Sequence, residues 1–180
     1  MARVESGLEQ AKRPVTGLAG PYGHPLHPAL VAVPIGAWIA SFVFDLASHL
    51  VHDAGFLAEG SRWLIGLGVL GALAAATVGF LDLFAIPTGT RAFRVALVHM
   101  ALNLGVTVAY GIDFAIRGAH PPAPVPVGPL VLSGVALAAL TASGYLGGEL
   151  AYRYGVRVAD EATQQRGYTS STAVPPREDT

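Results

Sequence analysis

Residues 28–48 read PALVAVPIGAWIASFVFDLAS, a run of 21 residues in which Asp45 is the one charged side chain. A helix needs about 20 mainly apolar residues to cross about 30 Å of hydrocarbon. Because lipid offers the backbone no hydrogen-bond partners, such a run is expected to be helical. Three more runs meet the same requirement: 63–84 with Asp82, 95–116 with His99 and Asp113, and 128–151 with Glu149. The sequence therefore predicts an all-α fold, a four-transmembrane-helix bundle.

The composition also indicates a chain built for lipid. Charged residues make up 13% of the sequence and hydrophobic residues 52%, whereas a soluble domain carries about 25% charged residues. The alternative, buried helical hairpins in a soluble protein, would need more polar surface than this chain has. The formal net charge of −1 gives no reason to expect a nucleic-acid partner. Cysteine is absent, which excludes disulfides, thiol nucleophiles, iron–sulfur ligation and covalent haem attachment.

Three segments are expected along the chain. Residues 1–22 mix charges without an apolar core, so they do not resemble a signal peptide and form an N-terminal segment. Residues 23–158 form the transmembrane domain, with short connections between the spans. Residues 159–180 are rich in Gln, Ser, Thr and Pro. Such a composition cannot bury a core, so a disordered tail is expected there.

The orientation follows from the basic residues. Four spans place both termini and the connection at 87–94 on one side of the membrane. Basic residues near cytoplasmic helix ends set the topology of a membrane protein. The sequence thus predicts an up-down-up-down bundle in the cell membrane, with both termini and the tail cytoplasmic. Seven basic residues near the spans belong to that side, namely Arg3, Lys12, Arg13, Arg91, Arg94, Arg153 and Arg157, against Arg62 and Arg117 on the other.

Polar residues within the spans follow the helical period. His27 and Asp45 are 18 positions apart, which is about five turns, so they share one face of the first helix. A narrow polar stripe on the third helix is predicted to line the bundle interior rather than an exposed amphipathic surface. We expect Asp45, Tyr110 and Asp113 to be interior polar residues. Asp113 and Arg117 are also spaced as an ion pair at the end of one helix. The stripe consists of His99, Asn103, Tyr110, Asp113 and Arg117.

Two histidines are the candidate cofactor ligands. His27 precedes Pro28 at the start of the first span, where the positive helix end favours a neutral imidazole. His99 lies at a similar depth on the third helix, with Asn103 one turn further. Asp82 and Glu149 at that depth are predicted to accept an imidazole proton. Two imidazoles from different helices are what a bundle needs to bind haem b. We predict His27 and His99 as ligands that face each other, with Asn103 beside them. A single metal ion is the alternative, bound by residues from His24, His27, His99, Asp82 and Glu149.

Several motifs resemble one known family. They are Gly23-His24-Pro25-Leu26-His27-Pro28, Pro34-Ile35-Gly36, Asp45, His99-x-x-Leu102-Asn103 and Gly147-Gly148-Glu149-Leu150-x-Tyr152-x-x-Gly155. Together they resemble the bacterial membrane family known as domain of unknown function number 2231. The resemblance spans about residues 20–158. It implies a four-helix membrane domain and leaves the activity open.

Three classes of function are compatible with these residues. The first is a b-type haem or metal-binding component of electron transfer, with a redox partner. The second is a non-catalytic structural or accessory subunit that binds another membrane subunit. The third is a small transporter or proton path through Asp45, His99 and Asp113, although nothing resembles an inverted repeat. No nucleophile triad or phosphate loop is present in the sequence, so an enzyme is not expected.

Overall fold

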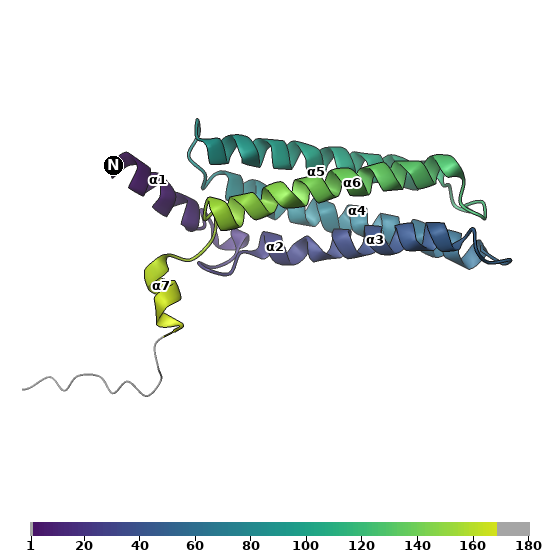
Figure 1. The fold of residues 1–180 in the computed structure, drawn as a ribbon, viewed down its shortest axis with the longest axis horizontal. Coiled ribbons are helices and arrows are strands. Elements are labelled where there is room, and N and C mark those ends of the chain that lie inside the picture. Colours follow the sequence, from purple (N-terminus) through teal and green to yellow (C-terminus); the bar gives the residue numbers. More distant parts are fainter. Residues whose placement is uncertain (1, 169–180) are drawn as a thin grey trace, which may run out of the picture.

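Four long helices lie side by side in a computed structural model of the chain, which describes residues 2–168, with side chains from residue 6 onward (Figure 1). All four are long and apolar enough to cross a membrane. This confirms the predicted all-α bundle. The first span consists of α2 (Leu26–Leu30) and α3 (Ala32–Ala47), and the next two are α4 (Gly55–Leu83) and α5 (Arg91–Ile116). The fourth is α6 (Val127–Gly148), continued by the π-helical turn η2 (Glu149–Arg153).

The helices extend beyond the apolar runs of the sequence. Helix α4 begins at Gly55 and α5 at Arg91, whereas the runs begin at residues 63 and 95. An apolar run marks the part of a helix that hydrocarbon surrounds, and the helix itself continues into the polar interface. Thr90 explains the start of α5, because its Oγ1 accepts a hydrogen bond from the Phe93 amide at 3.1 Å. Gly118, with φ +64°, follows its last turn.

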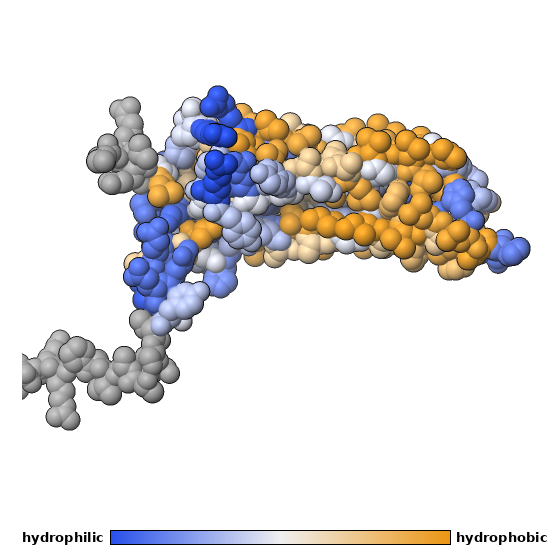
Figure 2. Space-filling view, viewed as in Figure 1, coloured by the Kyte–Doolittle hydropathy of each residue, from blue (hydrophilic) through white to orange (hydrophobic). Residues whose placement is uncertain are grey.

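The surface of the bundle is apolar and its interior is partly polar. Leu70, Val135 and Phe56 expose more than half of their surface, and apolar residues cover the sides of the bundle in Figure 2. Asp45 and Asp113 are fully buried. This distribution is the one expected of helices that present apolar side chains to lipid and turn polar groups toward each other.

The four spans pack as two hairpins. Helix α3 packs mainly on α4, and α5 mainly on α6, while α4 with α5 and α3 with α6 join the hairpins. The first and third spans are therefore diagonal across the bundle. Trp38 from α3 stacks on Tyr110 from α5 at the centre, with ring centroids 4.2 Å apart and planes 9° apart. Ile65, Val106 and Ala136 complete this core.

The terminal segments lie at one end of the bundle, which we call the His27 end (Figure 1). They form α1 (Ala2–Lys12), the 3-10 turn η1 (Gly17–Ala19) and α7 (Glu161–Arg166). Helix α7 falls within residues 159–180, for which the composition predicts disorder. Local bonds explain the difference: Asp160 Oδ1 accepts from the Thr163 amide at 2.6 Å, and the Tyr22 hydroxyl donates to Asp160 Oδ2 at 2.9 Å. Residues 169–180 lie outside the described residues. Which end of the bundle faces the cytoplasm stays a prediction.

Candidate functional site

His27 and His99 lie close together inside the bundle. His27 comes from α2 and His99 from α5, on diagonal spans. Their ring centroids are 6.3 Å apart and their planes are perpendicular. The two imidazoles therefore lie next to each other, edge to face, near the His27 end. Whether they bind a ligand is a separate question.

Each imidazole is held by one backbone carbonyl. His27 Nδ1 lies 2.9 Å from the Ala75 oxygen on α4, and His99 Nδ1 lies 2.8 Å from the Ser143 oxygen on α6. A carbonyl oxygen can only accept a hydrogen bond, so Nδ1 carries the proton in both rings. In a neutral imidazole with this tautomer, Nε2 has a free lone pair. His27 Nε2 is thus left for a ligand, whereas His99 Nε2 lies 3.3 Å from the Asn103 amide nitrogen.

A glycine lies beneath each ring. A Cβ atom built on Gly79 would lie 2.8 Å from His27 Nδ1, and one built on Gly147 would lie 3.0 Å from His99 Cε1. Each glycine is one helical turn past the residue whose carbonyl holds the ring. A side chain at Gly79 would therefore displace the His27 ring, and one at Gly147 would press on the His99 ring.

Asn103 belongs to the surroundings of His99. Its Nδ2 donates to Ser143 Oγ at 2.6 Å and to the His99 carbonyl at 2.8 Å. Ser143 Oγ lies 3.0 Å from His99 Nδ1. Asn103 and Ser143 thus link α5 to α6 and restrict the His99 ring to one orientation. Asn103, which was predicted to bind a cofactor, therefore positions the His99 ring in the structure.

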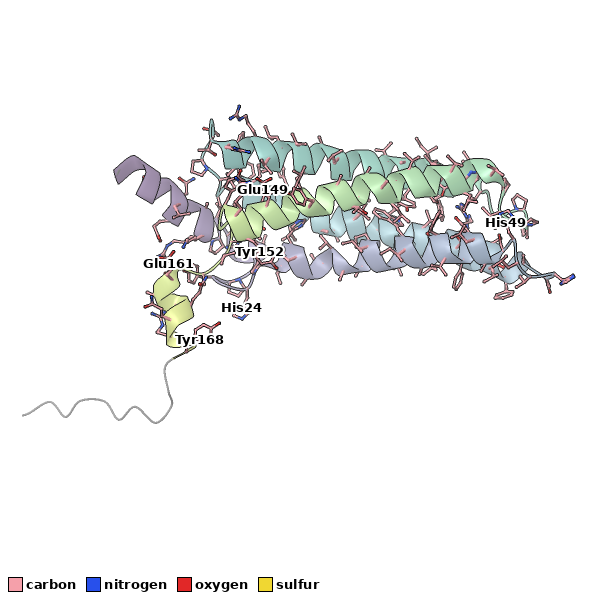
Figure 3. The ribbon with its side chains drawn as sticks, in the orientation of Figure 1. His24, His49, Glu149, Tyr152, Glu161 and Tyr168 are labelled. Atoms are coloured by element: carbon pink, nitrogen blue, oxygen red, sulfur yellow. The ribbon has the colours of Figure 1, made fainter. Side chains whose placement is uncertain are left out.

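The five residues predicted as an alternative metal set are not brought together. No three His, Asp or Glu side chains within residues 2–168 form a group that could hold a metal ion. His24 is exposed and lies away from Glu149 in Figure 3. Glu149 Oε1 instead accepts from Arg153 Nη1 and from the Tyr154 hydroxyl, both at 3.0 Å. Both carboxylates pair with arginines, Asp82 with Arg157 and Glu149 with Arg153. Backbone carbonyls, and not these carboxylates, accept the imidazole protons.

Asp82 is bound by Arg157, a residue that the sequence identified only by its charge. Arg157 Nε lies 2.7 Å from Asp82 Oδ1. Its Nη2 donates to the carbonyls of Ala19 and Gly20 at 2.9 and 3.0 Å, and its amide donates to Ala11. The backbone of Arg157 has φ +62°, a strained conformation for a residue with a side chain. These contacts, the Arg157 cluster, bind the N-terminal segment to the His27 end of the bundle.

A second charged cluster lies at the opposite end and is centred on Arg117. Arg117 donates to both oxygens of Asp45 at 2.7 Å, and to both oxygens of Asp113 at 3.0 and 3.2 Å. Ser61 Oγ donates to Asp45, and Ser133 Oγ donates to Asp113. All five residues are buried. We call them the Arg117 cluster, and they join all four spans.

This cluster tests two predictions. Asp45 and Asp113 are interior residues, as predicted. The i, i+4 ion pair of Asp113 and Arg117 also exists, but it is not an isolated pair at a helix end, because Arg117 reaches across to Asp45 on α3. Tyr110 is interior as predicted, and its hydroxyl lies 3.3 Å from the Ser133 carbonyl.

The two hairpins place equivalent residues at constant separations. Paired residues on the first helix of each hairpin are 72 positions apart: His27 with His99, Trp38 with Tyr110, and Asp45 with Arg117. The residues that these side chains contact on the second helices are 68 positions apart: Ala75 with Ser143, Gly79 with Gly147, and Ile65 with Ser133. Each of the three pairs meets in the interior of the bundle, between the two hairpins.

Reciprocal contacts support a two-fold relation between the hairpins. A Cβ atom built on Gly66 would lie 2.9 Å from Phe114, and one built on Gly134 would lie 3.5 Å from Phe42. Contacts of this kind, made in both directions by equivalent residues, are typical of a two-fold axis. The axis runs along the bundle, as in transporters with parallel repeats. The sequence signal is short: HPAL at 27–30 and HMAL at 99–102.

The family model described as Predicted membrane protein (DUF2231) matches residues 23–160, so the chain belongs to this family. The match covers the four spans, both histidines, the Arg117 cluster and Arg157. No curated protein and no solved structure is significantly similar to the chain.

Proposed function

We propose that this member of the family binds haem b between His27 and His99 and serves as an electron-transfer component of the membrane. The observation that carries the proposal is the pair of adjacent imidazoles, each held through Nδ1 by a backbone carbonyl. Hydrogen bonding of the second ring nitrogen is how proteins orient histidine ligands and raise their basicity. The redox partner is expected to be another membrane or membrane-associated protein.

The closeness of the two rings would let His27 and His99 hold one haem between them. The observed separation is 6.3 Å. Two protein ligands suffice for a haem iron, which takes its other four from the porphyrin. A bare ion would need further ligands, and the described residues offer no third histidine or carboxylate there.

Arg157 supports a porphyrin rather than a bare ion. It is 4% exposed, and its Nη1 has no hydrogen-bond partner among residues 2–168. It lies beside Asp82, which is one turn along α4 from Gly79 and the His27 ring. A buried guanidinium group with a free N–H is a suitable partner for a porphyrin carboxylate. When bound, the haem iron would supply reversible one-electron transfer, and the chain's own residues orient it and exclude water.

The test is the absorption spectrum of the full chain, purified from cells supplied with a haem precursor. The preparation should show a Soret band that sharpens on reduction. His27→Gln and His99→Gln should each abolish the band or convert it to that of a five-coordinate haem. The exposed His24 offers a matched control, and His24→Gln should leave the spectrum unchanged. A colourless and metal-free protein would contradict the proposal and favour the structural-subunit function.

We also propose that the His27 end faces the cytoplasm. The support is the seven-to-two excess of basic residues near the spans at that end. A reporter that is active only in the cytoplasm, fused after Val158, should be active. The same reporter inserted in the connection at 118–126 should be inactive, and the opposite pattern would refute this orientation.

A further inference from the structure

A cleft of about 460 Å³ opens at the His27 end, between α1, the turn η2 and α7. Figure 3 shows Tyr152 and Glu161 at this end of the molecule. Apolar and basic side chains line it together, including Leu8, Lys12, Tyr152 and Arg153. The cleft is separate from the imidazole pair, so a ligand in it would bind independently of the proposed haem.

Lys12 is the unusual residue of this cleft. It is the one lysine in the sequence, and it is 8% exposed. Its Cε would lie 3.9 Å from a Cβ atom built on Gly155, so its stem packs on the turn that follows η2. The ammonium group makes no hydrogen bond or ion pair with any residue of the described part of the chain. The stem of Lys12 is buried while its ammonium group has no protein partner, so the charge is held in the cleft where an anion can reach it.

The level of the cleft along the bundle indicates which anion. Tyr152 and Arg153 lie at the end of the fourth span, which runs to Arg153. Tyr152 is 92% exposed, and exposed tyrosines at span ends lie at the level of lipid headgroups. Arg153 adds a second cation, although it is paired with Glu149 at 3.0 Å. Glu161 is the one acidic residue that lines the cleft, so the charge of the lining is positive.

We propose that this cleft binds the phosphate of an anionic phospholipid, with Lys12 as its main ligand. The phosphate oxygens accept from the Lys12 ammonium and from the exposed side of Arg153. Leu8 and Ala151 provide apolar surface for the glycerol and the start of an acyl chain. The bound lipid links α1 to the end of the fourth span and pairs with the charge of Lys12.

The test measures lipid binding by the full-length chain in an uncharged detergent, using native mass spectrometry. Dioleoylphosphatidylglycerol should bind at least about fivefold more tightly than dioleoylphosphatidylcholine, which is the effect of one basic residue near an anionic headgroup. Lys12→Gln should remove this preference, and Lys12→Arg should retain most of it. Arg91→Gln is the matched control, because Arg91 is an exposed basic residue at the same end and does not line the cleft.

Three results would overturn the proposal. Lys12→Gln could keep the full preference for phosphatidylglycerol, which would mean that Lys12 is not a ligand. Arg91→Gln could lower the affinity as much as Lys12→Gln does, which would indicate a diffuse charged surface. Millimolar inorganic phosphate could displace the lipid and bind with the same dependence on Lys12, and the ligand would then be a free anion. If Lys12→Gln fails to fold, the lipid preferences of Lys12→Arg and Arg153→Gln are compared instead. Lys12→Arg should keep most of the preference for phosphatidylglycerol and Arg153→Gln should lower it.

Discussion

Replacing Arg117 by methionine removes the one cation from a fully buried cluster. Asp45 and Asp113 have no exposed surface, and the side chain of Arg117 is 1% exposed. With one arginine between two aspartates, the formal charge of the cluster is −1. In Arg117→Met it becomes −2, with two carboxylates close together and only serine hydroxyls to donate to them. The substitution therefore leaves charged groups without a partner in a site that water does not reach.

The expected cost is large. Removing one partner of a buried ion pair destabilises a protein by about 3–5 kcal/mol, whereas a typical interhelical hydrogen bond in lipid is worth about 0.6 kcal/mol. Arg117 bonds to both aspartates, so we expect the upper part of that range, a large share of the about 5–15 kcal/mol that keeps most proteins folded. The triple variant with Asp45→Leu, Asp113→Leu and Arg117→Met removes all three charges. It should recover most of the loss, because apolar replacement of a whole buried cluster is often neutral or stabilising.

The assay is equilibrium unfolding in mixed detergent micelles, followed by circular dichroism. Arg91→Met is the control, because Arg91 is exposed, and it should change the free energy of unfolding by less than about 0.5 kcal/mol. A loss below about 1 kcal/mol in Arg117→Met would refute the reasoning. It would show that the two aspartates are neutral in the native state, or that water reaches them.

Three further predictions concern the His27 end. Gly79→Ala should displace the His27 ring, lower the free energy of unfolding by about 1–3 kcal/mol and alter the haem spectrum. Gly36→Ala is the control, because no atom lies within 4 Å of a Cβ built there, and it should have none of these effects. A Gly79→Ala protein with unchanged stability and spectrum would mean that the ring can shift freely. Asp82→Leu should lower the melting temperature and expose the N-terminal segment to protease, because Arg157 loses its carboxylate, and a more stable variant would contradict this structural role. The pKa of Asp160 is lowered from 3.8 to about 2, mainly because its side chain accepts a hydrogen bond from the Thr163 amide. The contribution of Asp160 to the stability of α7 is therefore complete above pH 3.8 and is lost as the pH falls toward about 2. Hydrogen exchange of the α7 amides should accelerate over that interval in the wild type but not in Asp160→Asn, and an equal response in both would exclude Asp160 as the cause.

The class of fold could be predicted from the sequence alone. Apolar runs of 21–24 residues leave the backbone few alternatives to a helix in lipid, so the four spans could be located from composition alone. The helical period also placed His27 and Asp45 on one face, and His99, Asn103, Tyr110 and Asp113 on another, which identified the side chains that turn inward. These features depend on local spacing, and local spacing is visible in one sequence.

Contacts between distant parts of the chain could not be predicted and are visible only in the folded molecule. Arg117 pairs with Asp45, a partner 72 positions away, and Arg157 pairs with Asp82 on another span. The sequence could assign the depth of each charge but not its partner, because several opposite charges lie at each level of the bundle. The same holds for the imidazoles: carboxylates at the right depth were their predicted partners, yet the carbonyls of Ala75 and Ser143 bind them. Every residue has a carbonyl, so no side-chain pattern could identify these two, and only the close packing that Gly79 and Gly147 allow brings the rings to them.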